Sequence, residues 1–133
     1  MMLLPVLVAC AQQDENIANA QVYDGISEGE TISLSGTEPF WSITIAQGVA
    51  TYSTPENAQG TDFAVARFAG NNGLGFSGEL NGENVLIAVT PGKCNDAMSD
   101  REYPFTATIA LGDRSLSGCA YTDRQPFKGD ARP

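Results

Sequence analysis

Hydrophobic and polar residues alternate along most of the chain after Glu30. In residues 31–34 and 41–45, serine or threonine alternates with isoleucine, leucine or tryptophan. A period of two is typical of a β-strand with one buried face. Similar short segments recur between turn residues, so the pattern predicts about eight antiparallel strands. They are Ile32–Leu34, Trp41–Ile45, Val49–Tyr52, Phe63–Phe68, Leu74–Leu80, Val85–Val89, Phe105–Leu111 and Ser115–Tyr121.

Turn residues separate these segments. Asn81-Gly82 is the strongest hairpin signal, because both residues tolerate a positive φ. A longer loop is expected from Pro91 to Tyr103. Short strands with short connections favour an all-β fold, a small antiparallel meander barrel, and the alternative is a two-layer β-sandwich. The other predicted turns are Gln47-Gly48, Asn71-Asn72-Gly73 and Gly112-Asp113.

Composition narrows the function classes. The chain has 133 residues, enough for one domain and a tail, and its 14 glycines and 7 prolines indicate many turns. A net charge of -9 would repel nucleic acid, so no nucleic-acid partner is expected. The sequence has no histidine, which removes the usual general base near neutral pH. We therefore expect a protein that is not an enzyme and that needs no cofactor and no metal.

The first nine residues form an apolar run that is too short to span a bilayer. Leu7, Val8, Ala9 and Cys10 resemble the lipobox of bacterial lipoproteins. The resemblance implies that residues 1–9 are a signal peptide remnant and that Cys10 carries a lipid anchor. Ala11 then implies the outer membrane, on the periplasmic side. The alternative is a buried N-terminal strand with a free cysteine.

The signal peptide lacks its usual positive charge over residues 1–5, which favours a translation start further upstream. Residues 10–29 are rich in Gln, Asn, Asp and Glu, a composition that predicts a lipidated tether. The β-domain is expected over 30–123. Residues 124–133, with two prolines and a glycine, are predicted to be a flexible tail.

Cys94 and Cys119 remain once Cys10 is assigned to the lipid. In an oxidising compartment outside the cytoplasm, such an even pair predicts a disulfide. A zinc site is the weaker alternative, because two thiolates without histidine or a CxxC motif lack the four ligands that structural zinc needs.

The loop PGKCNDAMSDREYP is the densest polar stretch of the β-domain. Its candidate residues for binding a ligand or partner are Asp96, Ser99, Asp100, Arg101 and Tyr103. The alternative is an Arg101 that pairs with Asp96 or Asp100 beneath the loop. The order D-A-M-S-D-R-E lacks the alternate oxygens and central glycine of an EF-hand. Asp96, Asp100 and Glu102 are too crowded to face each other across a substrate as an acid and base pair.

Trp41 is the single tryptophan and ends the segment GTEPFW. Successive strand residues point to opposite faces, so either Phe40 or Trp41 must leave the core. Trp41 is therefore a candidate for lining a ligand pocket at the barrel mouth, and the alternative is a plug in the core.

Three segments carry a family resemblance. GTEPFW at 36–41, PGKCNDAMSDREYPF at 91–105 and LSGCAY at 116–121 resemble a family of uncharacterised bacterial envelope lipoproteins with GNEPFW-like and CxDxMSDRxYP segments. Here Thr37 stands where Asn is expected. The resemblance supports the lipoprotein location and the disulfide.

A looser resemblance is to the membrane-bound inhibitors of c-type lysozyme, which are eight-stranded barrels. Ser117, Gly118 and Tyr121 match the SGxxY pattern of that family. An acidic barrel would also be steered toward a basic lysozyme.

These features predict a monomeric, lipid-anchored β-domain that faces the periplasm. We expect it to bind an unknown small ligand or envelope protein through Trp41 and the 93–103 loop. An inhibitor of c-type lysozyme and a purely structural spacer are the alternatives.

Overall fold

The structure, a computed structural model, describes residues 22–97 and 100–129. Eight β-strands account for most of these residues. No helix in this part of the chain is long and apolar enough to cross a membrane. The strands are β1 (Ile32–Thr37), β2 (Phe40–Ala46), β3 (Val49–Thr54), β4 (Asn57–Ala69), β5 (Leu74–Leu80), β6 (Glu83–Asn95), β7 (Glu102–Leu111) and β8 (Arg114–Thr122).

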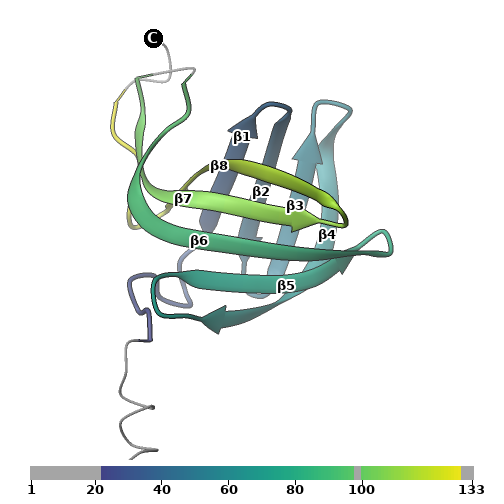
Figure 1. Ribbon diagram of the computed structural model, residues 1–133, viewed down its shortest axis with the longest axis horizontal. Helices are drawn as coiled ribbons and strands as arrows, with labels where there is room; N and C mark the ends of the chain where they lie inside the picture. The colour runs from purple at the N-terminus through teal and green to yellow at the C-terminus, as the bar shows by residue number, and fades with distance from the viewer. Residues whose placement is uncertain (1–21, 98–99, 130–133) are drawn as a thin grey trace, which may run out of the picture.

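The strands form a closed antiparallel barrel. Each strand pairs with the next one in the chain, and β8 pairs with β1 to complete the circle. In Figure 1, β5–β8 cross in front of β1–β4 at a steep angle. Closure removes the unpaired edges that would invite aggregation. The predicted meander barrel is therefore confirmed, and the β1–β8 pairing excludes the sandwich.

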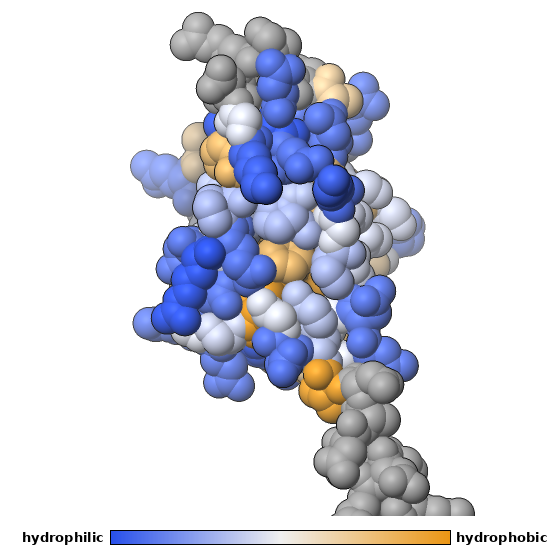
Figure 2. Space-filling model, turned by 90° about the vertical axis from the view of Figure 1, so that its left-hand side faces the viewer, coloured by the Kyte–Doolittle hydropathy of each residue, from blue (hydrophilic) through white to orange (hydrophobic). Residues whose placement is uncertain are grey.

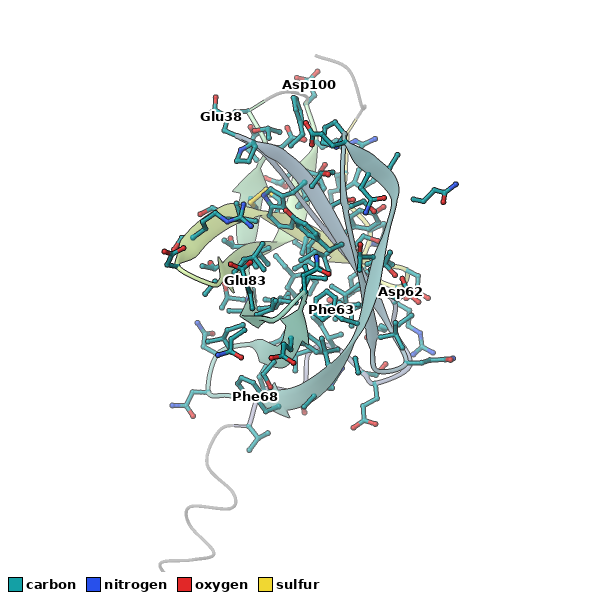
Figure 3. All side chains as sticks on the ribbon, turned by 90° about the vertical axis from the view of Figure 1, so that its right-hand side faces the viewer. Glu38, Asp62, Phe63, Phe68, Glu83 and Asp100 are labelled. Atoms are coloured by element: carbon teal, nitrogen blue, oxygen red, sulfur yellow. A yellow bond between two sulfur atoms is a disulfide. The ribbon has the colours of Figure 1, made fainter. Side chains whose placement is uncertain are left out.

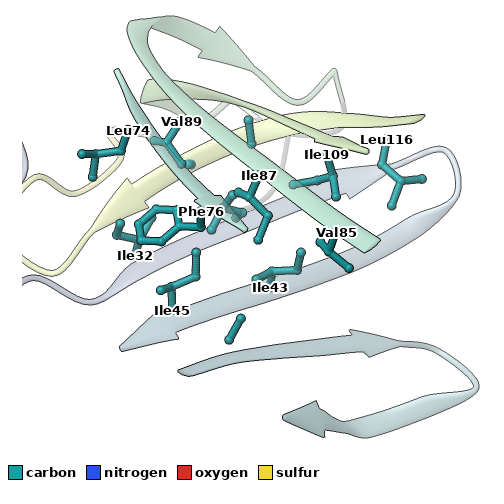
Figure 4. Close-up of a cluster of buried hydrophobic side chains, with 14 of the residues drawn as sticks. Ile32, Ile43, Ile45, Leu74, Phe76, Val85, Ile87, Val89, Ile109 and Leu116 are labelled. Carbon is teal, nitrogen blue, oxygen red and sulfur yellow. The ribbon is translucent and has the colours of Figure 1, made fainter. Parts of the chain in front are cut away.

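Apolar side chains from alternate positions fill the barrel (Figure 4). Ile43 and Ile45 of β2 are at most 3 % exposed, whereas Thr44 between them faces solvent. Burying a side chain of this size contributes about 1.5–3 kcal/mol. The alternation seen in the sequence is thus the alternation between the core and the outer surface.

Two hairpin turns have positive φ at both central residues, as type I′ turns require. The φ values are 53° and 81° at Gln47-Gly48, and 52° and 85° at Asn81-Gly82. Asparagine and glycine adopt this conformation at low cost. The predicted hairpin at Asn81-Gly82 is confirmed.

The β6–β7 hairpin extends past the barrel, and here the sequence prediction was wrong. A loop was expected from Pro91 to Tyr103, but β6 continues to Asn95 and Cys94 pairs with Tyr103. The register shifts between Pro91 and Cys94, and an irregularity of this kind bends a strand. Figure 1 shows the hairpin turning away from the barrel. Pro91 and Gly92 interrupt the alternation, which hides the extension in the sequence.

Segments on both sides of the predicted β-domain also pack on the barrel. In the predicted tether, Ile26 is 1 % exposed and the Tyr23 N–H donates to the Gly70 carbonyl. In the predicted tail, Lys128 and Glu102 exchange two backbone hydrogen bonds. The packed domain therefore reaches beyond 30–123 at both ends, because isolated anchoring residues leave no periodic pattern.

Candidate ligand-binding groove

An open groove of about 510 Å³ lies at one end of the barrel. Its walls come from the β1–β2 hairpin, the β3–β4 hairpin and the β6–β7 hairpin, which meet at the upper end in Figure 1. Figure 2 shows that the face on the β6–β7 side is mainly hydrophilic at this end. The groove is thus built from three turns that are far apart in the sequence.

Trp41 and Phe40 occupy opposite sides of β2, as the sequence predicted. Trp41 is 4 % exposed and packs in the core, while Phe40 is 53 % exposed, and both line the groove. A Cβ at Gly36 would collide with Nε1 of Trp41, so glycine makes room for the indole. Trp41 is therefore a core residue and a groove residue at once.

Asp96 and Arg101 meet at one hydroxyl. Nη1 of Arg101 donates to the Tyr103 hydroxyl at 3.3 Å, and that hydroxyl donates to Oδ2 of Asp96 at 3.1 Å. Burial raises the pKa of Tyr103, Arg101 opposes the increase and Asp96 adds to it. The hydroxyl therefore keeps its proton at neutral pH and links the two charged groups.

An aromatic cluster holds this polar trio in place. The Arg101 guanidinium lies 4.0 Å from the ring centre of Phe127, within the range of a cation–π contact. Phe127 also packs on Tyr103 and Tyr121, with ring centres 5.6 Å and 5.1 Å apart. The C-terminal segment thereby fixes one wall of the groove.

The Cys94–Cys119 disulfide is present, as predicted, and joins β6 to β8. It ties the base of the β6–β7 extension to the barrel. A second hollow of about 260 Å³ lies beside it and shares Ser35, Gly36, Thr37 and Asp96 with the first. The two hollows adjoin along these four residues, and we refer to them as the two lobes of the groove.

The structure brings together most of the predicted binding residues. Trp41, Asp96, Arg101 and Tyr103 line the groove, whereas Asp100 is exposed outside its lining. Ser99 and Cys10 lie outside the described residues. Of the three carboxylates considered as an acid and base pair, Asp96 alone is in the lining.

Sequence reasoning missed the hydroxyl residues of the groove. They are Ser35, Thr37, Ser42, Ser53 and Thr54, from β1, β2 and β3. In the sequence they look like the solvent-facing half of an alternating pattern. One signal was available. In a meander barrel, the last three positions of β1 and of β3 lie at the same end of the barrel as the GTEPFW turn, so their side chains could have been expected near Trp41.

The residues that match the lysozyme-inhibitor pattern have structural contacts here. A Cβ at Gly118 would collide with the Ser35 carbonyl, and the Tyr121 ring packs in the aromatic cluster. Inhibition of lysozyme stays a prediction. If an equimolar amount of the soluble protein does not slow lysozyme, this prediction is wrong.

Among the described residues, no group of three or more Cys, Asp or Glu side chains is placed to hold a metal ion. The chain matches no protein-family model, no curated protein and no solved structure. Any assignment of function therefore depends on the groove itself.

Proposed function

We propose that this protein is a lipid-anchored domain on the periplasmic side of the outer membrane, which binds a small polar ligand without converting it. The groove is the observation that carries the proposed ligand binding. Its volume of about 510 Å³ falls in the range of roughly 300–1,000 Å³ that is usual for small-molecule sites. Convergent polar side chains beside aromatic rings are the usual lining of such sites.

The position of the groove in the barrel is compatible with an anchor at the other end. The chain enters the described part at the β4–β5 turn, where Tyr23 is bonded to Gly70. Figure 3 places Phe68, near that turn, at the end opposite to Glu38 and Asp100, which mark the groove end. An anchor at Cys10 would hold the Phe68 end toward the membrane and leave the groove open to the periplasm.

The disulfide supports the compartment. Disulfides persist in oxidising surroundings such as the periplasm and are rare in the cytosol. The Cys94–Cys119 bond lies at the base of a groove wall, where Cys119 is 2 % exposed and Cys94 is half-buried. A domain with such a bond beside its groove suits an envelope location.

Binding can be tested by nuclear magnetic resonance with a library of small polar fragments. The probe protein is the full chain with Cys10→Ala, labelled with ¹⁵N. We expect one or more fragments to shift the amide resonances of groove residues such as Phe40 and Ser53. Ser42→Tyr fills the groove and should abolish these shifts.

Thr44→Tyr is the matched control, because Thr44 lies two residues further along the same face of β2 and outside the groove. It should leave the shifts unchanged. Fragments that map to another surface, or equal effects of the two tyrosines, would disprove the proposed site.

A further inference from the structure

The shape of the groove favours an elongated ligand. Its two lobes, of about 510 Å³ and 260 Å³, share four residues and run from the β3–β4 turn to the disulfide. Ser53, Thr54 and Pro55 lie at one end, and Ser117 and Gly118 at the other. A compact ligand would fill one lobe, whereas a short chain of linked units would contact both.

The hydroxyl lining favours a ligand that is itself rich in hydroxyls. Within residues 22–97 and 100–129, the five Ser and Thr hydroxyls of the first lobe make no hydrogen bond to another protein group. Each side chain is only partly exposed. A hydroxyl both donates and accepts, so its best partner is a group that can do the same.

Aromatic rings provide an apolar contact beside these hydroxyls. Phe40 and Trp41 both line the groove, and Phe40 is 53 % exposed whereas Trp41 is 4 % exposed. A sugar ring has polar edges and an apolar face of C–H groups, and such a face packs on an aromatic ring. Hydroxyls together with an exposed aromatic ring therefore match both surfaces of a saccharide.

The charges of the groove favour a neutral ligand, although the chain as a whole carries -9. The charged residues in the lining of the two lobes are Asp96 and Arg101, and both are bonded to the Tyr103 hydroxyl. One negative and one positive group cancel. A ligand with a net charge would leave one of them facing a like charge.

We infer that the ligand is a short, neutral oligosaccharide that lies along both lobes with one ring against Phe40. This inference rests on the proposed function and names the ligand class of the same groove. In this arrangement, the Ser and Thr hydroxyls of β1, β2 and β3 form hydrogen bonds with the hydroxyl groups along the edges of the ligand's sugar rings.

The test uses calorimetry and nuclear magnetic resonance on the full chain with Cys10→Ala. The probes are chitotetraose, cellotetraose and maltotetraose, with tetragalacturonate as the charged comparison. At least one neutral probe should bind and shift groove resonances in both lobes. Loss of the ring in Phe40→Ala should weaken binding about 3- to 10-fold, the usual range for an aromatic contact.

Phe68→Ala is the matched control, because Phe68 is 50 % exposed and lies at the other end of the barrel (Figure 3). It should leave affinity unchanged. Ser53→Ala should weaken binding about 5-fold through one lost hydrogen bond, and Thr44→Ala should not.

Each outcome decides between the two proposals. If polar fragments occupy the groove but all neutral tetrasaccharides fail, the ligand class is wrong and groove binding stands. If tetragalacturonate binds as well as the neutral probes, the preference for a neutral ligand is wrong. If Phe40→Ala and Phe68→Ala act alike, the placement of a sugar ring against Phe40 is wrong. If neither fragments nor sugars reach the groove, both proposals fall.

Discussion

Glu30 is a buried carboxylate that joins three parts of the chain. Its Oε1 accepts hydrogen bonds from Thr122 of β8 and from Gln125 of the C-terminal segment, at 2.5 Å and 3.1 Å. Its Oε2 accepts the Ser27 N–H at 2.8 Å. Burial alone would raise the pKa of Glu30, but these hydrogen bonds outweigh it and lower the pKa to about 2.

This shift predicts how stability depends on pH. Because the pKa in the folded protein lies below the usual 4.5, the ionised carboxylate stabilises the fold above pH 4.5. The contribution is lost as the pH falls from 4.5 toward 2. We therefore expect Glu30→Gln to lower the urea midpoint at pH 7, and the difference from the unmodified protein to shrink across that window. Exposed Glu28→Gln is the control, and an equal deficit of Glu30→Gln at pH 7 and pH 2.5 would contradict the assignment.

A single methyl group at Gly118 should disturb barrel closure. A Cβ there would meet the Ser35 carbonyl of β1, next to the pairing of Ser35 with Cys119 that closes the barrel. Overpacking of this kind costs about 1–3 kcal/mol. Gly118→Ala should lower the free energy of unfolding in urea by that amount. Gly29→Ala, with nothing within 4 Å of its Cβ, should change it by less than about 0.5 kcal/mol. Equal stability of the two variants would mean that β1 and β8 separate easily.

At the scale of elements, the β6–β7 extension is the part that makes a groove out of a barrel end. It carries Asp96, Arg101 and Tyr103, and the disulfide and the Phe127 contacts hold it to the body. The Cys94–Cys119 bond spans 25 residues of chain and encloses the whole tip of the hairpin. The groove wall is therefore cross-linked at its base.

Removing this cross-link should weaken both stability and the groove. For a closed loop of this length, we expect the Cys94→Ser, Cys119→Ser double variant to lose about 3–4 kcal/mol of unfolding free energy. Amide exchange should accelerate most in the part of the β6–β7 hairpin that extends past the barrel. The β2–β3 hairpin, which lacks any link to the disulfide, provides the internal reference. Uniform acceleration over both hairpins would show that the bond stabilises the barrel and not the groove wall.

The sequence predicted the eight strands because each buries one face, and it predicted the hairpin at Asn81-Gly82 because few residues adopt positive φ. It missed the extension of β6 and β7, where a register shift breaks the period of two. It also missed the packing of Ile26 and Phe127, because their segments carry no alternating pattern. Polar residues such as Ser35 and Ser53 gave no signal, since a groove residue and a solvent-facing strand residue look identical in an alternating pattern.

At the scale of the whole molecule, the chain entry and the groove lie at opposite ends of the barrel (Figure 3). This arrangement separates the proposed anchor from the proposed binding site. The sequence alone indicated both Trp41 and the 93–103 loop, but only the closed barrel brings Trp41 and Arg101 to one groove. A single chain can then be held by one end and bind with the other.

The separation predicts that anchoring and binding are independent. In the protein produced from its own chromosomal gene, Cys10→Ala should abolish incorporation of labelled palmitate and release the protein from the membrane fraction. Ala11→Asp keeps the cysteine and should retain the label while shifting the protein toward the inner membrane. Because the groove is at the far end, fragments that bind Cys10→Ala should bind the membrane-held form with the same affinity. Palmitate labelling that persists in Cys10→Ala would refute the anchor. Binding of fragments only after release from the membrane would mean that the groove faces the membrane.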